Sequence, residues 1–569
     1  QKQIDDSGYV KFLKSYGDYL IIEKPSTVDN LSFMVEYQFG YMYWRYLMWN
    51  FVGRQSDNQG RYGTQEGNWL SGVTFIDELH LGSQENLPYD VLNNKGRNVY
   101  FFLPFLLGLI GLMYHATKNG VYSLYESLQK YLAPKFAAPL IITASLLAAP
   151  VLMASQNWDD HDRSGKYTAL AMAKAYLYSC DQDAILFTIG DNDTFPLWYA
   201  QEIENIRTDI KIVNTSLFMT DWYIDQMKTK TYESDPLPIS FTHDEYVGDK
   251  LDYVVNIPKT DSRWDINDLM IFIKNPKSTV QMQNGQTIHF YPTNKVRIPV
   301  DKNTIIKNKV VGAQYFDSIV PFIDIDIKGK ALYKNRLMML DIVANNNWKR
   351  PIYFSGGAFD PEDYLWMKDY LQLDGLVYKL VPIKTPTSEN GNPLDMGQID
   401  SEKMYTNIMK WDWGNSEGDI YHDPETRRES ITYRTNLARL MNQLIKEGKT
   451  KKAETIINLA LTKMPLDKFE YYSLVDPFAD GFYKIGQQKN AQDLLVKLMS
   501  KYKDNLNYYS KISADEQSLL GVEIITDLER YRGLLEVMKD NNDIAFYEKN
   551  RSLFNTYVEI FDRFGRDKE

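Results

Sequence analysis

An uncharged apolar run in the first third of the chain is the feature that most limits its fold. The run is FAAPLIITASLLAAPVLMA at 136–154. Its length is close to the roughly 20 residues that a helix needs to cross the hydrocarbon core of a bilayer. Pro139 and Pro150 lie near its ends, where a membrane helix tolerates proline. The run therefore predicts a transmembrane helix.

A second uncharged run, VYFFLPFLLGLIGLMY at 99–114, is shorter. Tyr100 and Tyr114 lie where they would anchor its two ends at the membrane interfaces. The alternative is a buried core helix, because an apolar stretch of this length is also found in soluble proteins. We expect a transmembrane region over 99–155 that contains both runs.

The charges around the two runs predict their orientation. Three lysines (Lys118, Lys130 and Lys135) and one glutamate (Glu126) lie between the runs, and the acidic sequence NWDDHDR follows the second. Because loops with an excess of lysine and arginine stay in the cytoplasm, the residues after 155 are predicted to lie outside it.

The region before the first run, 1–98, is predicted to hold an interfacial helix and a loop. The sequence LSFMVEYQFGYMYWRYLMWNF at 31–51 is aromatic and amphipathic, with Glu36 and Arg45 inside it. A helix that lies in the membrane interface fits this pattern better than a span. The sequence that follows is rich in Gly, Asn and Gln, which is typical of a loop.

The composition is that of a folded protein with several units. The chain has 569 residues, of which 44% are hydrophobic and 24% charged, and this length divides into several cores. Its net charge of −11 argues against a nucleic-acid partner. Cys180 is the only cysteine, so an intramolecular disulfide is excluded. The chain begins at Gln1 without a signal-peptide pattern, and we expect a fragment, a processed product or part of something longer.

Alternating helix and strand patterns predict an α/β domain over 156–382. Apolar residues spaced at i, i+4 and i+8 predict a helix over 164–179. Short apolar strands at 184–189 and 210–214 enclose an acidic turn and a helix over 195–206. A strand–helix–strand unit of this spacing implies parallel strands with a right-handed crossover.

Further strands are predicted at 322–327 and 351–355, on either side of a helix near 331–347. Together these elements predict a mostly parallel sheet. Residues 236–320 have a β-rich character, with an Asn284-Gly285 hairpin turn between alternating residues. They are predicted to form an insertion in the domain.

Polar residues follow three of the predicted strands. In open α/β sheets, ligands bind beyond the carboxyl ends of the strands. The residues at these ends make up the candidate ligand site, and they are Asp191, Asp193, Asn214, Thr215, Ser216, Ser355, Gly356 and Gly357. Nothing in the pattern identifies a nucleophile or a general base.

The same residues suggest a metal site as one alternative. Two carboxylates at i and i+2, Asp191 and Asp193, can chelate a hard cation such as Mg²⁺ or Mn²⁺. The upstream residues that could add ligands are Asp159, Asp160, His161 and Asp162. The other interpretation is that Asp191 and Asp193 cap the next helix and shape the turn. The chain has no G-x-G-x-x-G, P-loop, G-x-S-x-G or H-E-x-x-H motif.

After a Pro-, Gly-, Asn- and Asp-rich linker at 383–428, the residues 429–569 are predicted to be helical. Two stretches, 448–465 and 486–503, align without a gap, each with a Gly turn before an amphipathic helix. The pattern is typical of a tetratricopeptide-type unit. Two copies are fewer than a free-standing array needs, so the region is expected to be either a partner-binding groove or a helical cap on the α/β domain.

Five stretches of the chain resemble, in order, a family of large Bacteroidota multi-pass membrane proteins. They lie at 30–55, 157–167 (NWDDHDRSGKY), 190–214, 220–227 (TDWYIDQM) and 349–357 (KRPIYFSGG). The N-terminal half of that family is similar to protein O-mannosyltransferases and other GT-C glycosyltransferases. This chain resembles its C-terminal part.

The resemblance implies a bacterial inner-membrane protein whose residues after 155 are periplasmic. It implies transfer of a sugar from a polyprenyl-phosphate donor to an acceptor, with the catalytic acidic residue in an early loop, upstream of this chain. Two alternatives remain: a membrane scaffold whose helical tail binds a protein partner, and a metal-dependent hydrolase that uses Asp191 and Asp193.

Overall fold

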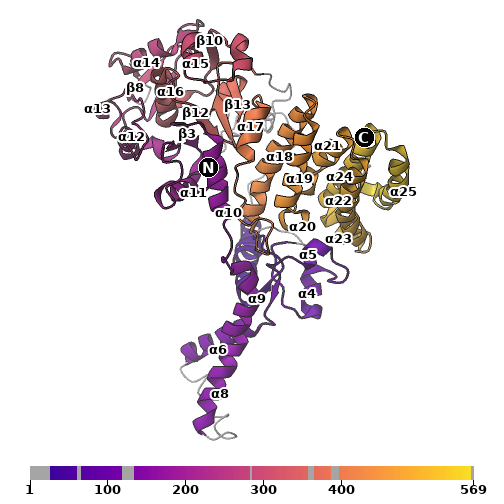
Figure 1. Ribbon diagram of the computed structural model, residues 1–569. Helices are drawn as coiled ribbons and strands as arrows, with labels where there is room; N and C mark the ends of the chain where they lie inside the picture. The colour runs from indigo at the N-terminus through magenta and orange to yellow at the C-terminus, as the bar shows by residue number, and fades with distance from the viewer. Residues whose placement is uncertain are drawn as a thin grey trace. The chain divides into compact units, whose positions relative to one another are not determined.

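A computed structural model describes residues 26–59, 66–117, 134–281, 285–356, 364–385 and 396–564 (Figure 1). These residues form a mixed α/β protein. The chain divides into two compact units. Unit 1 comprises Gln1–His161 with Asn507–Gly521, and unit 2 comprises Asp162–Leu506 with Val522–Glu569.

Unit 1 is built on three helical stretches. The first is continuous through α2 (Thr27–Phe33), the π-helix η1 (Met34–Arg45) and α3 (Tyr46–Phe51). The second is α6 (Leu103–Thr117). The third runs through α8 (Pro134–Leu146), the π-helix η2 (Leu147–Val151) and α9 (Leu152–His161). Pro150 lies inside η2, where a wider turn accommodates a residue that has no N–H to donate.

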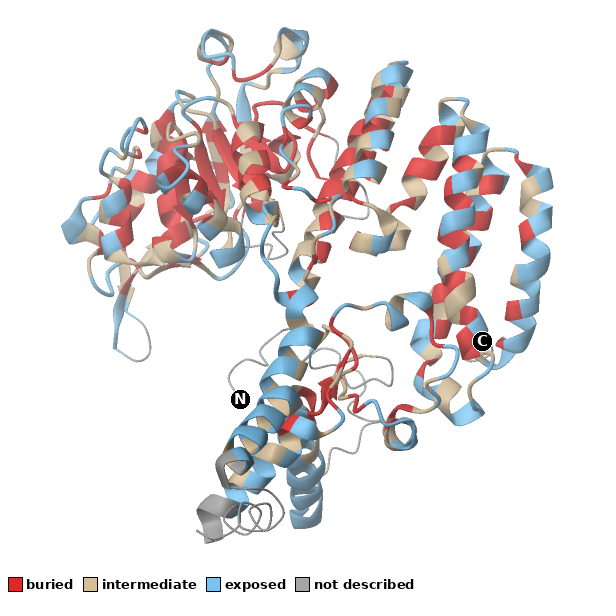
Figure 2. Ribbon diagram, turned by 60° about the horizontal axis from the view of Figure 1, so that its bottom comes forward, coloured by how far each residue is buried: buried red, intermediate tan, exposed pale blue. Residues whose placement is uncertain are grey.

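The predicted helix at 136–154 is confirmed and extends to His161. Ala138–His161 is long and apolar enough to cross a membrane, by length and composition, and Leu103–Met113 is a shorter apolar helix. Figure 2 shows the lower helices of unit 1 mostly in the exposed colour, and none of the apolar window of Ala138–His161 is buried. The lysine loop from Lys118 to Lys130 lies outside the described residues.

Polar and aromatic contacts hold the upper part of unit 1 together. The Asn157 side chain donates to the Tyr100 hydroxyl over 2.7 Å, which joins α9 to the segment before α6. Arg54 packs on the ring of Trp49 and faces Asp160 at 3.5 Å. The remaining elements of the unit are β1 (Gly53–Arg54), α4 (Thr74–Leu81), α5 (Tyr89–Leu92), β2 (Asn98–Val99) and α23 (Ala514–Leu519).

Unit 2 contains a five-stranded sheet in the order β13-β14-β12-β3-β4. Its strands are β3 (Ile185–Thr188), β4 (Lys211–Asn214), β12 (Ile352–Ser355), β13 (Leu371–Leu373) and β14 (Val377–Leu380). The strands β12, β3 and β4 are parallel, as predicted, but β14 and β13 are antiparallel to their neighbours. The prediction of a mostly parallel sheet is therefore correct for the pairs β12–β3 and β3–β4 and wrong for the pairs β12–β14 and β14–β13. A short connection with Gly375 at a φ of 118° lets β13 and β14 pair as a hairpin.

Helices pack on this sheet, and Figure 2 shows its strands as buried. They are α10 (Thr168–Ser179), α11 (Gly190–Glu202), α12 (Asp221–Met227), α16 (Lys334–Asn346) and α17 (Ser401–Ile408). The helix α11 begins at Gly190, so the prediction of a start at 195 was wrong. Asp191 and Asp193 lie in its first turn, where the helix dipole favours negative charge.

Two small sheets lie between β4 and α16 in the sequence. Their orders are β11-β5-β8-β7 and β10-β9-β6. The strands are β5 (Tyr253–Asn256), β6 (Trp264–Asp265), β7 (Thr279–Gln281), β8 (Thr287–Tyr291), β9 (Lys295–Pro299), β10 (Phe322–Asp326) and β11 (Ala331–Tyr333). The helices are α13 (His243–Tyr246), α14 (Ile266–Lys274) and α15 (Lys302–Lys307). The β7–β8 pairing confirms the predicted hairpin, and its residues 282–284 lie outside the described residues.

The strand predicted at 322–327 does not join β12. As β10 it pairs with β9 in antiparallel register. Arg297 of β9 and Asp324 of β10 are cross-strand partners, and their side chains meet at 2.8 Å. This ion pair and the adjacent pairing of Ile298 with Ile323 are cross-strand contacts of the kind that fix register.

The helical tail forms three antiparallel helix pairs. They are α18 (Pro424–Lys446) with α19 (Thr450–Lys463), α21 (Asp476–Lys484) with α22 (Gln488–Tyr509), and α24 (Gly521–Asp540) with α25 (Ile544–Ile560). The short α20 (Leu466–Phe469) follows α19.

The same turn joins the two helices of each pair. Gly448, Gly486 and Asn542 have positive φ angles of 72°, 80° and 59°. In each turn the next residue donates its N–H to a carbonyl five residues back, for example Lys449 to Leu444 and Asp543 to Met538, which is the Schellman arrangement. The prediction of two copies was incomplete, because Asn542 replaces glycine in the third.

Candidate functional site

Polar side chains meet at the carboxyl edge of the parallel strands, as the sequence predicted. Thr188, Asn214 and Ser355 end β3, β4 and β12, and all three are fully buried. The Thr188 and Thr194 hydroxyls are 2.7 Å apart, and Asn214 donates to the Thr194 hydroxyl over 3.0 Å. This edge is therefore a connected hydrogen-bond network rather than an open ligand site.

Asn214 has a structural role in that network. The oxygen of its side-chain amide accepts from the backbone N–H groups of Ser216 and Leu217, at 2.9 and 3.0 Å. The Thr215 hydroxyl donates to the Thr188 carbonyl over 2.9 Å. Asn214 and Thr215 thus use their polar atoms to shape the turn after β4, while the Ser216 side chain is exposed.

Asp193 is held at the same edge by Ser355. The Ser355 hydroxyl donates to the Asp193 carboxylate over 2.7 Å, and the Ser355 carbonyl accepts from the buried Tyr364 hydroxyl at 2.7 Å. Burial raises the pKa of Asp193, although the Ser355 hydrogen bond acts in the opposite direction. Gly356 follows β12 and is partly exposed, and Gly357 lies outside the described residues.

Asp191 makes no hydrogen bond to the described residues of this network and lines a cavity of about 540 Å³. One wall of the cavity comes from the first turns of α10 and α11, including Thr168, Met172, Asp191 and Phe195. Asp191 is exposed. The two predicted carboxylates therefore have different surroundings, one in the cavity and one behind the sheet edge.

The opposite wall is one face of α18. Thr426, Glu429, Ser430 and Tyr433 line the cavity, and their spacing of i, i+3, i+4 and i+7 places them on one side of a helix. Tyr433 is only 9% exposed, and its hydroxyl has no hydrogen-bond partner among the described residues. Its ring packs against those of Trp411 and Trp413, with centroids 5.4 and 5.5 Å away.

A tight loop puts Trp413 into the cavity wall. Gly414 has a φ of 55°, and a Cβ at that position would come within 2.4 Å of the Tyr167 carbonyl. Only glycine fits this approach to the start of α10. The Asp412 carboxylate accepts from the Gly414 N–H over 3.0 Å and forms an ion pair with Lys174 at 2.8 Å. Trp413 is thereby fixed between α10 and α18.

The cavity is acidic. It is lined by two cationic side chains, Arg163 and Lys166, and by five carboxyls, Asp191, Asp412, Asp423, Glu425 and Glu429. Three of the carboxyls have ion-pair partners, because Lys166 contacts Asp423, Lys174 contacts Asp412 and Arg428 contacts Glu425. The other two, Asp191 and Glu429, have no hydrogen-bond or ion-pair partner in the described part of the chain.

Glu429 is the carboxyl of the cavity whose surroundings raise its pKa. Burial, and next the negative charge of Asp193, raise the pKa of Glu429 to about 7. On the same wall, burial opposes ionisation of Asp423, but Lys166 and the Thr426 N–H lower its pKa to about 2. A half-buried carboxyl that titrates near neutral pH can accept hydrogen bonds when ionised and donate one when protonated.

The predicted metal ligands are not brought together in one unit. Asp159, Asp160 and His161 end α9 in unit 1, where His161 contacts Asp160 at 2.6 Å. Asp191 and Asp193 belong to unit 2, which begins at Asp162. Among the described residues, no group of three His, Cys, Asp or Glu side chains could hold a metal ion.

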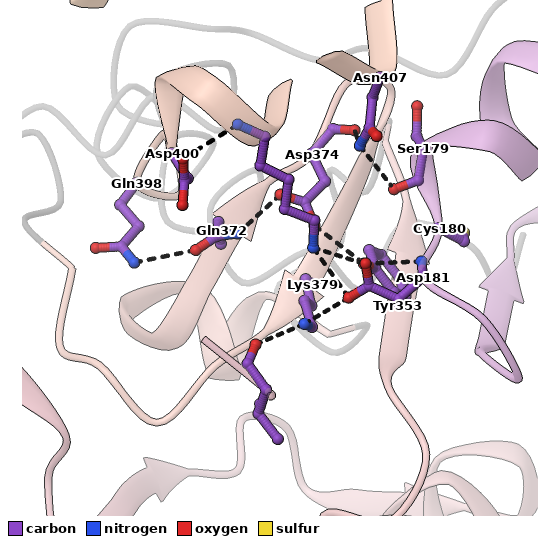
Figure 3. A network of polar contacts seen from close by, with 12 residues as sticks. Ser179, Cys180, Asp181, Tyr353, Gln372, Asp374, Lys379, Gln398, Asp400 and Asn407 are labelled. Carbon is purple, nitrogen blue, oxygen red and sulfur yellow. Dashed lines mark hydrogen bonds and ion pairs between the residues drawn. The ribbon is translucent and has the colours of Figure 1, made fainter. Parts of the chain in front are cut away.

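A second polar cluster lies at the other end of the strands (Figure 3). Asp181, before β3, contacts Lys379 at 2.6 Å and Lys403 at 2.9 Å. Lys403 also contacts the fully buried Asp374 at 2.7 Å, and Tyr353 donates to Asp374 over 3.0 Å. Burial opposes ionisation of Asp181, but Lys379 and Lys403 hold its pKa well below the usual range. These contacts tie α17 to the sheet, and the cluster lines none of the cavity.

Three residues of the cavity were missed from sequence: Trp413, Glu429 and Tyr433. They lie in or beside the stretch predicted as a linker and helical tail. The i, i+4 spacing of Glu429 and Tyr433 on a helix that starts at the Asp423-Pro424 cap was the available signal. It could not be connected to Asp191, because a sequence does not show which helices pack together.

Residues 169–403 match the family model called TMEM260-associated domain 2, which is consistent with a TMEM260-related family. The match begins in α10, includes the five-stranded sheet and ends in α17, so it contains Asp191 and Asp193 but not Glu429 or Tyr433. No curated protein and no solved structure was found to match the chain.

Proposed function

We propose, from this match, that the chain is the C-terminal part of a membrane glycosyltransferase. The reaction would move a sugar from a polyprenyl-phosphate donor to an acceptor outside the cytoplasm. The observation that carries the proposal is the TMEM260-associated match at 169–403, which follows directly after a helix able to cross a membrane. It agrees with the resemblance of five stretches to a family with a GT-C-like N-terminal half.

The cavity of unit 2 fits a recognition role in such a protein. Small-molecule sites are concave, mostly apolar and supplied with a few placed polar groups. Here Phe195, Trp413 and Tyr433 supply aromatic surface, and Asp191 and Glu429 supply hydrogen-bond acceptors. In this proposal the role of unit 2 is binding, and the catalytic acidic residue is the one that the family resemblance implies in an early loop upstream of this chain.

The test is a transfer assay on the full-length protein in nanodiscs. Polyprenyl-phosphate sugars and candidate acceptors are supplied, and the mass of the acceptor is followed by mass spectrometry. We expect a gain of one sugar mass. The control variant Glu536→Gln, at an exposed residue of α24, should transfer as the native protein does. No transfer across a broad panel of donors and acceptors would contradict the proposal.

A membrane scaffold is the second candidate. The third helix pair favours it, because three units meet the minimum for a stable helical array. It predicts a protein that co-purifies with the full chain and is lost when 429–569 is deleted. The metal-dependent hydrolase through Asp191 and Asp193 stays a prediction without a supporting observation.

A further inference from the structure

We propose that the cavity between α10, α11 and α18 is a sugar-binding site, in which Glu429 and the Tyr433 hydroxyl bind the hydroxyl groups of one sugar ring. The proposal rests on the proposed function for the class of ligand. The existence of a binding site is argued from the structure alone.

The first step is the unpartnered polar groups. Tyr433 is more than nine-tenths buried and lines the cavity, yet its hydroxyl bonds to no described residue. Glu429, one helical turn earlier and half-buried, also has no hydrogen-bond or ion-pair partner among the described residues. Neither the Tyr433 hydroxyl nor the Glu429 carboxyl is among the enclosed atoms that lack a hydrogen bond, and both residues line the cavity. Two unpartnered polar groups on the same face of one helix are therefore available to a ligand or solvent in the cavity.

The second step is the geometry of the aromatic walls. Trp413 and Tyr433 have ring planes inclined at 48°, so they form a corner rather than a flat stack. Phe195, on the opposite wall, is 50% exposed. A sugar ring has apolar C–H faces and a polar rim. Aromatic surfaces on two sides and carboxyls on the helix face therefore match both of its surfaces.

The third step is charge. The ion pairs of Asp423, Asp412 and Glu425 leave Asp191 and Glu429 as the carboxyls free to accept hydrogen bonds. Hydrogen bonds that involve an ionised group are about twice as strong as neutral ones. A phosphate or carboxylate ligand is disfavoured by the five acidic side chains. The sugar portion of a donor or acceptor, rather than its phosphate, is the part that fits.

The fourth step is size. A cavity of about 540 Å³ lies within the range of about 300–1,000 Å³ that small-molecule sites occupy. It therefore has room for a sugar ring.

The test measures binding without any transfer. The full chain, purified in detergent, is titrated with the methyl glycosides of mannose, glucose, galactose and N-acetylglucosamine by calorimetry. We expect at least one of these to bind. Glu429→Gln keeps the shape but loses the charge, and should weaken that binding about tenfold, which is the equivalent of about 1.4 kcal/mol. Tyr433→Phe should weaken it severalfold. Glu536→Gln is the matched control and should bind as the native chain does.

Two further measurements keep the outcomes distinct. Thermal unfolding of each variant shows whether it is folded. If Glu429→Gln does not fold, the test uses Tyr433→Phe, which removes only one oxygen atom. Tetramethylammonium is titrated as a cationic probe of the same acidic, aromatic cavity. Binding of this cation alone, with dependence on Glu429, would overturn the sugar assignment, and so would glycoside binding that neither variant weakens.

The result separates this inference from the proposed function. Glycoside binding through Glu429 in a full-length protein that transfers nothing would support the site and contradict the transferase. Transfer by the full-length protein, with no glycoside bound by the cavity, would contradict the site alone.

Discussion

A single buried carboxyl can make the stability of this protein depend on pH. Asp476 is the first residue of α21, and one of its carboxylate oxygens is buried without a hydrogen-bond partner among the described residues. Burial raises the pKa of Asp476 from 3.8 to about 7, although the charge of Arg530 acts against this. Because the folded state holds the proton more tightly, the stability from this group is complete below its ordinary pKa and is lost as the pH rises through about 7.

Asp476→Asn should remove that loss. The neutral amide needs no proton, so the variant should gain about 2 kcal/mol over the native chain at pH 8, with little difference at pH 4. The midpoint of thermal unfolding measured across this range reports the change. The control is Asp493→Asn at an exposed position of α22, which should follow the native chain at both pH values. Parallel curves for native and Asp476→Asn proteins would contradict the prediction.

Residue-level expectations from sequence were correct in part. Asp193, Asn214 and Ser355 lie at the same edge of the sheet, as predicted. This follows because β3, β4 and β12 are parallel, so that their carboxyl ends are neighbours. What Asp191 and Asp193 face could not be predicted. It depends on α18, whose residues lie far along the chain, and on a helix start five residues earlier than the pattern suggested.

Among the elements, α17 is attached to the sheet by buried charge. Lys403 forms ion pairs with both Asp181 and Asp374. Removing one partner of a buried pair leaves the other charge uncompensated, at a cost of about 3–5 kcal/mol. We expect this loss for Lys403→Met, measured by chemical unfolding. Lys452→Met, which breaks a more exposed pair with Glu402, should cost under about 1 kcal/mol. Equal losses for both variants would contradict a special role of the buried cluster.

Gly481 and Gly533 both lie inside helices of the tail, so the same substitution can be compared at the two positions. A Cβ at Gly481 of α21 would lie 2.3 Å from the Met441 sulfur of α18, whereas no atom in the described part of the chain lies within 4 Å of a Cβ at Gly533 of α24. Gly481→Ala should destabilise the protein by about 1–3 kcal/mol through overpacking. Gly533→Ala should stabilise it by about 0.5–1 kcal/mol, because alanine loses less backbone entropy in a helix. The midpoints of thermal unfolding should move in opposite directions, and a shift in the same direction would contradict this packing.

Element types were easier to predict than partners. Apolar runs and Gly turns identified β3, β4, β12, α19 and α22, since these signals are local. The strand β10 was assigned to the wrong sheet because a short apolar strand carries no record of its neighbour. The third helix pair was missed because an asparagine adopts the left-handed conformation at Asn542 as glycine does at Gly448 and Gly486.

On the scale of the whole molecule, Ala138–His161 is the helix that is long and apolar enough to cross a membrane. A lysine in the middle of a spanning helix costs about 2.5–3.5 kcal/mol on insertion scales. Leu146→Lys, at an exposed position of this helix, should therefore raise the fraction of protein released from membranes by alkaline carbonate. Ser155→Lys lies nearer the end, where a lysine can reach the interface, and should release no more than the native chain. Equal release for both variants would argue that this helix does not span.

Length and apolar composition were enough to predict that helix, because both are properties of one continuous stretch of sequence. The division of the chain into two units could not be predicted from the sequence, because unit 1 includes Asn507–Gly521, which lies far along the chain from the rest of that unit.

The ion pair between Lys166 and Asp423 joins residues 257 positions apart, and this separation has a consequence for biosynthesis. The chain emerges from the ribosome at about 5–20 residues per second, so the wall that carries Asp191 and Phe195 exists well before α18 is made. The cavity is therefore completed only once α18 is made, after all five strands of the sheet. A chain terminated before α18 would lack the wall that carries Glu429 and Tyr433.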